Sequence, residues 1–293
     1  MIFLFFLAFI FWYFPVSVMN LSKVLAAFGG VFGINQRISI YPNFGSQILG
    51  LLLVFQFGIV GWHYVKQTFG TMMTYSYYDS YELSGGQRNL IKWSLYGIWW
   101  VFFLKANEGL KSFTTWGMTY YSLDLPPILT LFAQIYLVIT LVLTLTLVFF
   151  MNWWRNGKFP TPAVIVPFVA MYIWFPAWDA LFISDYFALV VPCAHSLQYL
   201  CFVYKVERES KKDFSSRKLF WLASWLILSI VIGGFIIIEV LPSYLDDYVL
   251  SKGLMTAGFF TASVQIFINV HHYFIDNAIW QSKNKEIKGH LFS

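Results

Sequence analysis

Charged residues are scarce in this chain, and their scarcity argues against a soluble fold. Asp, Glu, Lys and Arg together make up 11% of the 293 residues, against about 25% in a typical soluble protein. The 19 Lys and Arg and 14 Asp and Glu side chains are too few to cover the surface of a soluble protein of this length. The deficit of charge therefore predicts a polytopic integral membrane protein.

Cysteine and the common nucleotide-binding and hydrolase motifs are also lacking. Cys193 and Cys201 are eight positions apart, which in a helix separates them by about 12 Å along the axis and excludes a disulfide between them. The sequence contains no P-loop, GxSxG, CxxC or GxGxxG motif, so nucleotide-driven and serine-hydrolase activities have no support. The net charge of +5 is typical of basic cytoplasmic loops, and we expect no nucleic-acid partner.

Apolar and aromatic residues are correspondingly abundant. Hydrophobic residues reach 59% and aromatic residues 22%, with 32 Phe, 18 Tyr and 13 Trp. Part of this excess predicts belts of Trp and Tyr at the membrane–water interfaces, as at Trp99–Trp100, Tyr120–Tyr121 and Trp153–Trp154. The remaining aromatic residues must pack between helices or line a pocket.

The apolar runs predict an all-α helical bundle with about eight transmembrane helices, forming a single domain over residues 1–293. A bilayer core requires about 20 apolar residues per helix. The predicted helices are Met1–Phe14, Ser46–Val65, Leu90–Leu104, Pro127–Met151, Thr161–Trp178, Asp185–Tyr204, Lys218–Leu241 and Leu250–Ile279. Seven helices are possible if the proline-containing segment Thr161–Trp178 is re-entrant.

Charges in the later loops orient the chain in the membrane. Six basic residues lie in the fourteen positions from Lys205 to Lys218, and three lysines lie in the C-terminal tail. The loop after the seventh helix instead carries Asp246 and Asp247 with only Lys252. Because basic loops stay in the cytoplasm, we expect both termini to be cytoplasmic. Since no organelle-targeting segment is present, the expected location is a bacterial inner membrane.

Four of the five histidines fall inside predicted helices, where ionisable groups are costly and are candidates for function. They are His63, His195, His271 and His272. On the last helix the polar residues are spaced by four, three and four positions, which places them on one face that must meet a partner or a cavity. These residues are Gln265, Asn269, His272 and Asp276.

Two further helices carry a histidine beside other polar groups on one face. His195 shares its face with Gln198 and Tyr199, and His63 shares its face with Lys66 and Gln67. The predicted topology runs these two helices and the last one in the same direction, with the histidines at similar depth. We therefore expect the imidazoles of residues 63, 195 and 272 to converge.

The residue types in this expected centre suit metal chemistry. Neutral imidazoles bind iron, copper or zinc, and a carboxylate completes the coordination or orients a histidine. We expect His63, His195 and His272 to bind non-haem iron, His271 to be a further candidate ligand, and Asp276 to orient or ligate. Haem held by two histidines and a metal-free proton relay that uses Asp276, Lys66 and Glu108 are the alternatives.

The order of these motifs resembles that of the Brp/Blh family. The motifs that carry the resemblance are Trp62-His63-Tyr64, His195-Ser196-Leu197-Gln198-Tyr199 and His272-Tyr273-Phe274-Ile275-Asp276. That family consists of bacterial and archaeal membrane proteins that cleave beta-carotene to retinal, using non-haem iron held by histidines in a helical bundle. Val16 and Asn20 stand where the family has His and Asp, and Tyr199 stands where it has a second His.

The resemblance implies a dioxygenase-like membrane oxidoreductase that acts on a carotenoid- or lipid-like substrate. In this interpretation Tyr199 lies beside the metal as a hydrogen-bond donor, and an aromatic wall holds the substrate and excludes water. The expected partners are the lipid bilayer and a hydrophobic small molecule. The alternative is a non-catalytic transporter or helix-bundle subunit whose polar groups only pair with one another.

Overall fold

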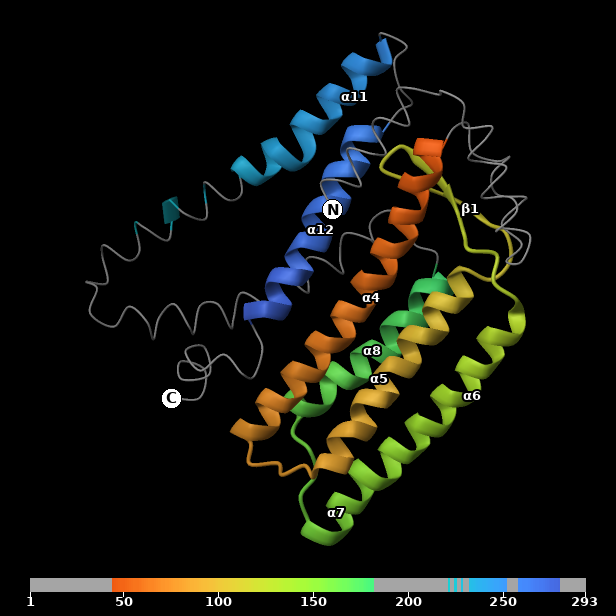
Figure 1. Ribbon diagram of the computed structural model, residues 1–293. Helices are drawn as coiled ribbons and strands as arrows, with labels where there is room; N and C mark the ends of the chain where they lie inside the picture. Colours follow the sequence, from red (N-terminus) through yellow and green to blue (C-terminus); the bar gives the residue numbers. More distant parts are fainter. Residues whose placement is uncertain are drawn as a thin grey trace. The chain divides into compact units, whose positions relative to one another are not determined.

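The computed structural model describes residues 44–181, 232–251 and 258–279 and the single positions 221, 224, 225 and 228. This part of the chain is mostly helical (Figure 1). It divides into two compact units. The first unit contains Met1–Phe57, Ser112–Tyr121 and Leu197–Ser293, and the second contains Gly58–Lys111 and Ser122–Ser196.

The described part of the second unit consists of helices that alternate in direction along the chain. Within it, α5 packs along both α6 and α8, as Figure 1 also shows. A π-helical turn, Leu145–Phe150, joins α6 to α7 without a break. The helices are α4 (Phe44–Tyr78, which enters this unit at Gly58), α5 (Gly85–Ala106), α6 (Pro127–Thr144), α7 (Met151–Asn156) and α8 (Pro162–Leu181).

Local sequence signals explain where these helices begin and end. Ser84 and Gln87 form a capping box at the start of α5, in which each side chain accepts a hydrogen bond from the other residue's backbone N–H. Pro127 occupies the first turn of α6, where its missing N–H costs nothing. Gly157 ends α7 in the left-handed conformation, with a φ of 65°.

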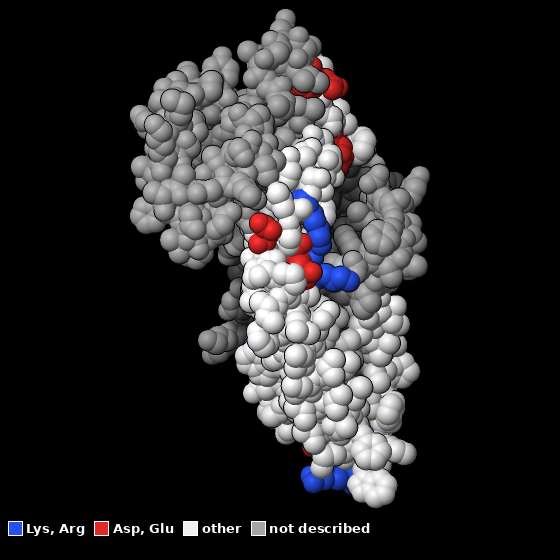
Figure 2. Space-filling view, turned by 90° about the vertical axis from the view of Figure 1, so that its right-hand side faces the viewer, with Lys and Arg blue, Asp and Glu red and all other residues white. Residues whose placement is uncertain are grey.

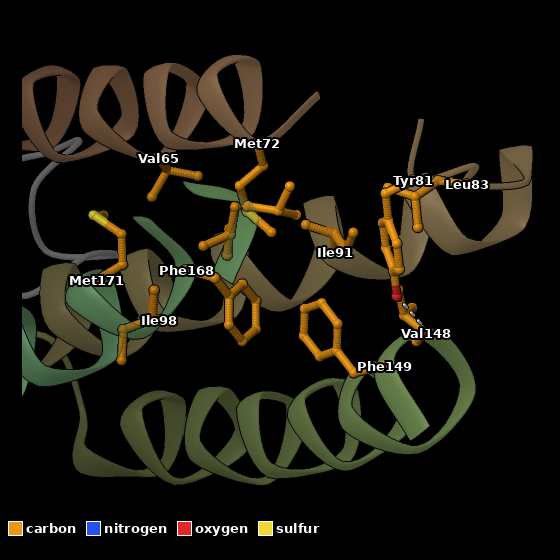
Figure 3. Packing of buried hydrophobic residues seen from close by; sticks show 12 residues of the cluster. Val65, Met72, Tyr81, Leu83, Ile91, Ile98, Val148, Phe149, Phe168 and Met171 are labelled. Carbon is orange, nitrogen blue, oxygen red and sulfur yellow. Dashed lines mark hydrogen bonds between the residues drawn. The ribbon is translucent and has the colours of Figure 1, made fainter. Parts of the chain in front are cut away.

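The core of the second unit is an apolar cluster whose buried residues come from α4, α5, α8, the α4–α5 connection and the π-helical turn. Val65 and Met72 come from α4, Ile91 from α5 and Phe168 from α8, and all are almost completely buried (Figure 3). The Tyr81 hydroxyl, in the α4–α5 connection, donates to the carbonyl of Val148, 3.4 Å away. This bond satisfies a backbone group in the π-helical turn, where the regular helical hydrogen bonding shifts.

The outward face of α6 is apolar and exposed. Phe132 is 62% exposed and Val138 60% exposed, and ten further Ile, Leu, Val and Phe side chains between Ile128 and Phe150 are exposed as well. Figure 2 shows a broad uncharged surface with blue and red side chains gathered at its two ends. Two of the described helical stretches, Gln47–Tyr78 and Pro127–Asn156, are long and apolar enough to cross a membrane.

The first unit combines a short β-hairpin with two packed helices. Strands β1 (Ser112–Thr115) and β2 (Met118–Tyr121) pair antiparallel. Helix α11 (Leu241–Ser251) follows a π-helical turn, Ile236–Val240, and packs against α12 (Phe259–Ile279). A side chain on Gly258 would meet the carbonyl oxygen of Trp116 at 2.1 Å, so only glycine allows the start of α12 to lie this close to the hairpin turn.

The structure changes several predicted boundaries. Helix α4 extends thirteen residues beyond the predicted end at Val65, and α5 is longer at both ends than Leu90–Leu104. The segment after Leu241, predicted as a loop, is helical through Ser251. The hairpin departs from the all-α prediction. Residues 162–181 form one helix despite three prolines.

Other predictions fall on parts of the chain outside the described residues. The predicted helices Met1–Phe14 and Asp185–Tyr204 lie there entirely. The total of about eight spanning helices and the single domain remain predictions.

Candidate functional site

Helix α4 is buried on two opposite faces in the second unit. One face carries Val65 and Met72, which are 1% and 0% exposed and belong to the apolar core. His63 lies nine positions before Met72, which places it about 180° around the helix, yet it is only 8% exposed. His63 is therefore buried on the side of α4 opposite the apolar core.

The environment of His63 is polar along the helix. Gln67 and Thr71 follow at intervals of four and share its face, and Thr71 is 4% exposed. The Nε2 of Gln67 is buried and finds no hydrogen-bond partner among the described residues. Gln56 lies on the part of α4 that belongs to the first unit and is 1% exposed. Its Oε1 is also buried and finds no hydrogen-bond partner among the described residues. A buried amide group without a partner is costly, so the face of α4 that carries His63 and Gln67 is the candidate site in the second unit.

Helix α12 carries the longest predicted polar stripe, which lies beside an apolar face. The most buried face of α12 is apolar and contains Ala262, Ile266, Val270 and Tyr273. The stripe residues Gln265, Asn269 and His272 lie one position away and are half-buried. The stripe therefore borders the packed face of α12 rather than forming it.

One residue of the stripe has a defined polar partner. The Gln265 amide donates to the Glu239 carboxylate at 3.1 Å. Glu239 lies in the π-helical turn before α11, and nothing in the sequence pattern singled it out. Asp276 lies on α12, but its side chain falls outside the described residues.

The remaining candidate ligands are distributed over the chain. His271 is exposed, and its ring stacks on Phe267 with the centroids 5.6 Å apart. His272 belongs to the first unit and His63 to the second. His195 and Tyr199 lie outside the described residues. Among the residues that are described, no three His, Cys, Asp or Glu side chains gather in a group that could hold a metal ion. Convergence of the histidines stays a prediction.

A second polar cluster, missed at the sequence level, surrounds the π-helical turn of the second unit. Gln87 Nε2 donates to the Leu147 carbonyl at 3.1 Å and to the Asn152 side-chain oxygen at 2.8 Å. Burial raises the pKa of the nearby Tyr81 phenol. The Nδ2 of Asn152 is buried without a hydrogen-bond partner among the described residues. The partners lie about 60 residues apart in sequence, so no local pattern could have revealed them.

Asp246 occupies a position that the sequence pattern did not predict. It was expected in an outer loop, but its carboxylate lies at the start of α12. It accepts hydrogen bonds from the backbone N–H of Phe260 at 2.7 Å and of Thr261 at 3.0 Å, and from the Thr261 hydroxyl at 2.7 Å. A carboxylate at a helix N-terminus compensates the unpaired N–H groups and the helix dipole.

Comparison with known proteins adds no relative. The chain matches no protein-family model, no curated protein and no solved structure.

Proposed function

We propose that this protein is an integral membrane protein and that His63 belongs to a polar centre within the membrane. Two features together support this proposal: the outward face of α6 is apolar and exposed, and the polar face of α4 is buried. Soluble monomers rarely expose a continuous apolar surface of this extent. In lipid, by contrast, a buried imidazole and unpaired amides mark a functional position.

The chemistry proposed for this centre is that of a membrane oxidoreductase with non-haem iron. This proposal is supported by the burial of the His63 imidazole, which lies on one face of α4 with further polar groups. His63, His195 and His272 would hold the metal, with His271 as a further candidate ligand. Bound iron would supply the activation of dioxygen toward a hydrophobic substrate.

The other residues of the chain position and protect the reacting groups in this proposal. Asp276 orients a ligand or completes the coordination, and Tyr199 donates a hydrogen bond beside the metal. The aromatic residues of the bundle bind a carotenoid- or lipid-like molecule and exclude water. The sequence order of the histidine-bearing segments supports these assignments.

A second candidate function is a non-catalytic transporter or helix-bundle subunit. It is favoured by the way in which polar groups of the second unit already pair between helices. The Ser94 hydroxyl and the Tyr172 hydroxyl bond to each other between α5 and α8, and the Thr144 hydroxyl donates to the Leu90 carbonyl at 3.2 Å. Such bonds stabilise a bundle by about 1 kcal/mol each without any chemistry.

The metal content of the purified protein separates the two candidates. The oxidoreductase proposal expects about one iron per chain, lost in His63→Ala and in His272→Ala. His290→Ala, in the polar C-terminal tail, serves as the matched control and should keep the iron. A wild-type protein purified without metal from iron-replete cells would refute the proposed centre, and a Soret band would indicate haem instead.

A further inference from the structure

Two lysines in the second unit lie over aromatic rings on neighbouring helices. The Lys66 Nζ, on α4, lies 4.3 Å from the centroid of the Trp62 ring. The Lys92 Nζ, on α5, lies 5.8 Å from the centroid of the Tyr96 ring. The two helices are in contact, since the Trp99 Nε1 of α5 donates to the Gly58 carbonyl of α4 at 2.9 Å.

Each of the two lysines lies beside an aromatic ring one helical turn away on its own helix. The connection between α4 and α5 covers residues 79–84, so the end of α4 and the start of α5 lie at the same end of the unit. Lysine normally extends toward the nearest polar surface. The Lys66 ammonium lies beside the ring of Trp62, one turn earlier in α4, and the Lys92 ammonium lies beside the ring of Tyr96, one turn later in α5.

Holding the two cations together has an electrostatic cost. Lys66 and Lys92 are close enough for their charges to repel each other. Neither α4 nor α5 contains an acidic residue, so these two helices contribute only positive charge here. The repulsion is stronger in a medium of low dielectric constant than in water. An anion between the two ammonium groups would convert this repulsion into attraction.

The surface beside the two lysines is aromatic and open. Trp99 and Phe103 continue the α5 face of Lys92 and Tyr96, and their rings stack with centroids 5.9 Å apart. Trp99 is fixed by a hydrogen bond from its Nε1 to the Gly58 carbonyl at 2.9 Å. Lys92 itself is exposed, and Trp100, in contact with both aromatic rings, is 43% exposed. A ligand can therefore reach the ammonium groups from outside the unit along an apolar surface.

We infer that Lys66 and Lys92 bind the phosphate group of an anionic phospholipid, whose acyl chains lie along the aromatic face of α5. Charge complementarity selects the anion, and the adjoining aromatic surface selects a ligand with apolar chains. The inference rests on the membrane location proposed above and is independent of the metal centre.

The test uses the full-length protein purified in a neutral detergent, with its thermal unfolding measured at increasing lipid concentration. Phosphatidylglycerol should raise the melting temperature of the wild type, whereas phosphatidylcholine and inorganic phosphate should not. The double variant Lys66→Gln/Lys92→Gln should need at least tenfold more phosphatidylglycerol for the same shift. Lys158→Gln, which removes one exposed charge between α7 and α8, should respond as the wild type does.

Three outcomes would overturn the inference: an unchanged response in the double variant, an equal response to phosphatidylcholine, or an equal response to inorganic phosphate. If the double variant does not fold, Lys66→Arg/Lys92→Arg and the single glutamine variants replace it. The arginine pair should keep the response, and each glutamine variant should weaken it. A protein that purifies without detergent would instead refute the membrane location, so the two failures are distinguishable.

Discussion

At the scale of single residues, Asp246 shows how one carboxylate can order a helix that begins 13 positions later. Its two oxygens accept three hydrogen bonds from residues 260 and 261 while the side chain is 9% exposed. Hydrogen bonds to a charged group contribute more than neutral ones. The start of α12 therefore depends on Asp246 more than on any signal in its own first turn.

Replacing this carboxylate gives the prediction at this scale. Asp246→Ala should lower the free energy of unfolding by about 2–3 kcal/mol, because it leaves two backbone N–H groups of α12 unpaired. Asp247→Ala removes the same charge from an exposed position next to it and should change stability by at most about 0.5 kcal/mol. Thermal or denaturant unfolding in detergent measures both. Equal effects of the two variants would contradict the assigned role of Asp246.

Residue identity alone predicted only part of the side-chain environments described above. The sequence singled out His63 because an imidazole in an apolar helix needs a reason to be there, and its burial agrees with that reasoning. The bonds of Asp246 to α12 and of Gln87 to Asn152 were not predictable, since they join residues far apart in sequence. Polar pairs across a fold follow from tertiary packing, which a local pattern does not contain.

At the scale of secondary structure elements, the close packing of α5 on α6 depends on Gly97. A side-chain carbon at this position would lie 3.2 Å from the Leu137 Cα and 3.3 Å from the Thr140 hydroxyl oxygen. Small residues at helix contacts let backbones approach closely. A methyl group at position 97 would therefore require the α6 backbone at Leu137 to move by a few tenths of an ångström.

A pair of glycine substitutions tests this packing. Gly97→Ala should destabilise the protein by about 1–3 kcal/mol, because the added methyl group forces α5 and α6 apart. Gly70→Ala, in α4, has no neighbour within 4 Å of the added carbon and should be neutral or stabilising by up to about 1 kcal/mol, because alanine favours helix. Unfolding in detergent gives both values. A Gly97→Ala variant as stable as Gly70→Ala would show that the helices are not in close contact.

The hairpin is the element that the hydropathy pattern missed, although its sequence carries a local signal. Trp116 and Gly117 both have positive φ, 50° and 75°, as a two-residue type I′ turn requires. Thr and aromatic residues flank the turn on both sides, as strands prefer. In the pattern of apolar runs, this segment is only a gap between two predicted helices. The predicted helices were too short for a related reason. Helices α4 and α5 continue into polar sequence beyond the apolar runs that set the predicted bounds.

At the scale of the whole molecule, the central claim is that the chain crosses a membrane. The exposed apolar residues of α6 would face lipid, and the exposed charged residues would lie at the membrane surfaces. The predicted orientation places Asp124, before α6, outside the cell and Lys158, after α7, in the cytoplasm. A soluble protein with the same fold would expose all of these surfaces to water.

Cysteine labelling in intact cells tests this claim most directly, with Cys193 and Cys201 first replaced by alanine. A membrane-impermeant maleimide should label Asp124→Cys from outside and Lys158→Cys only after permeabilisation. Phe132→Cys, at a position 62% exposed on α6, should stay unlabelled in both conditions because lipid covers it. Labelling of Phe132→Cys as complete as that of Lys158→Cys would contradict the membrane location and with it the proposed functions.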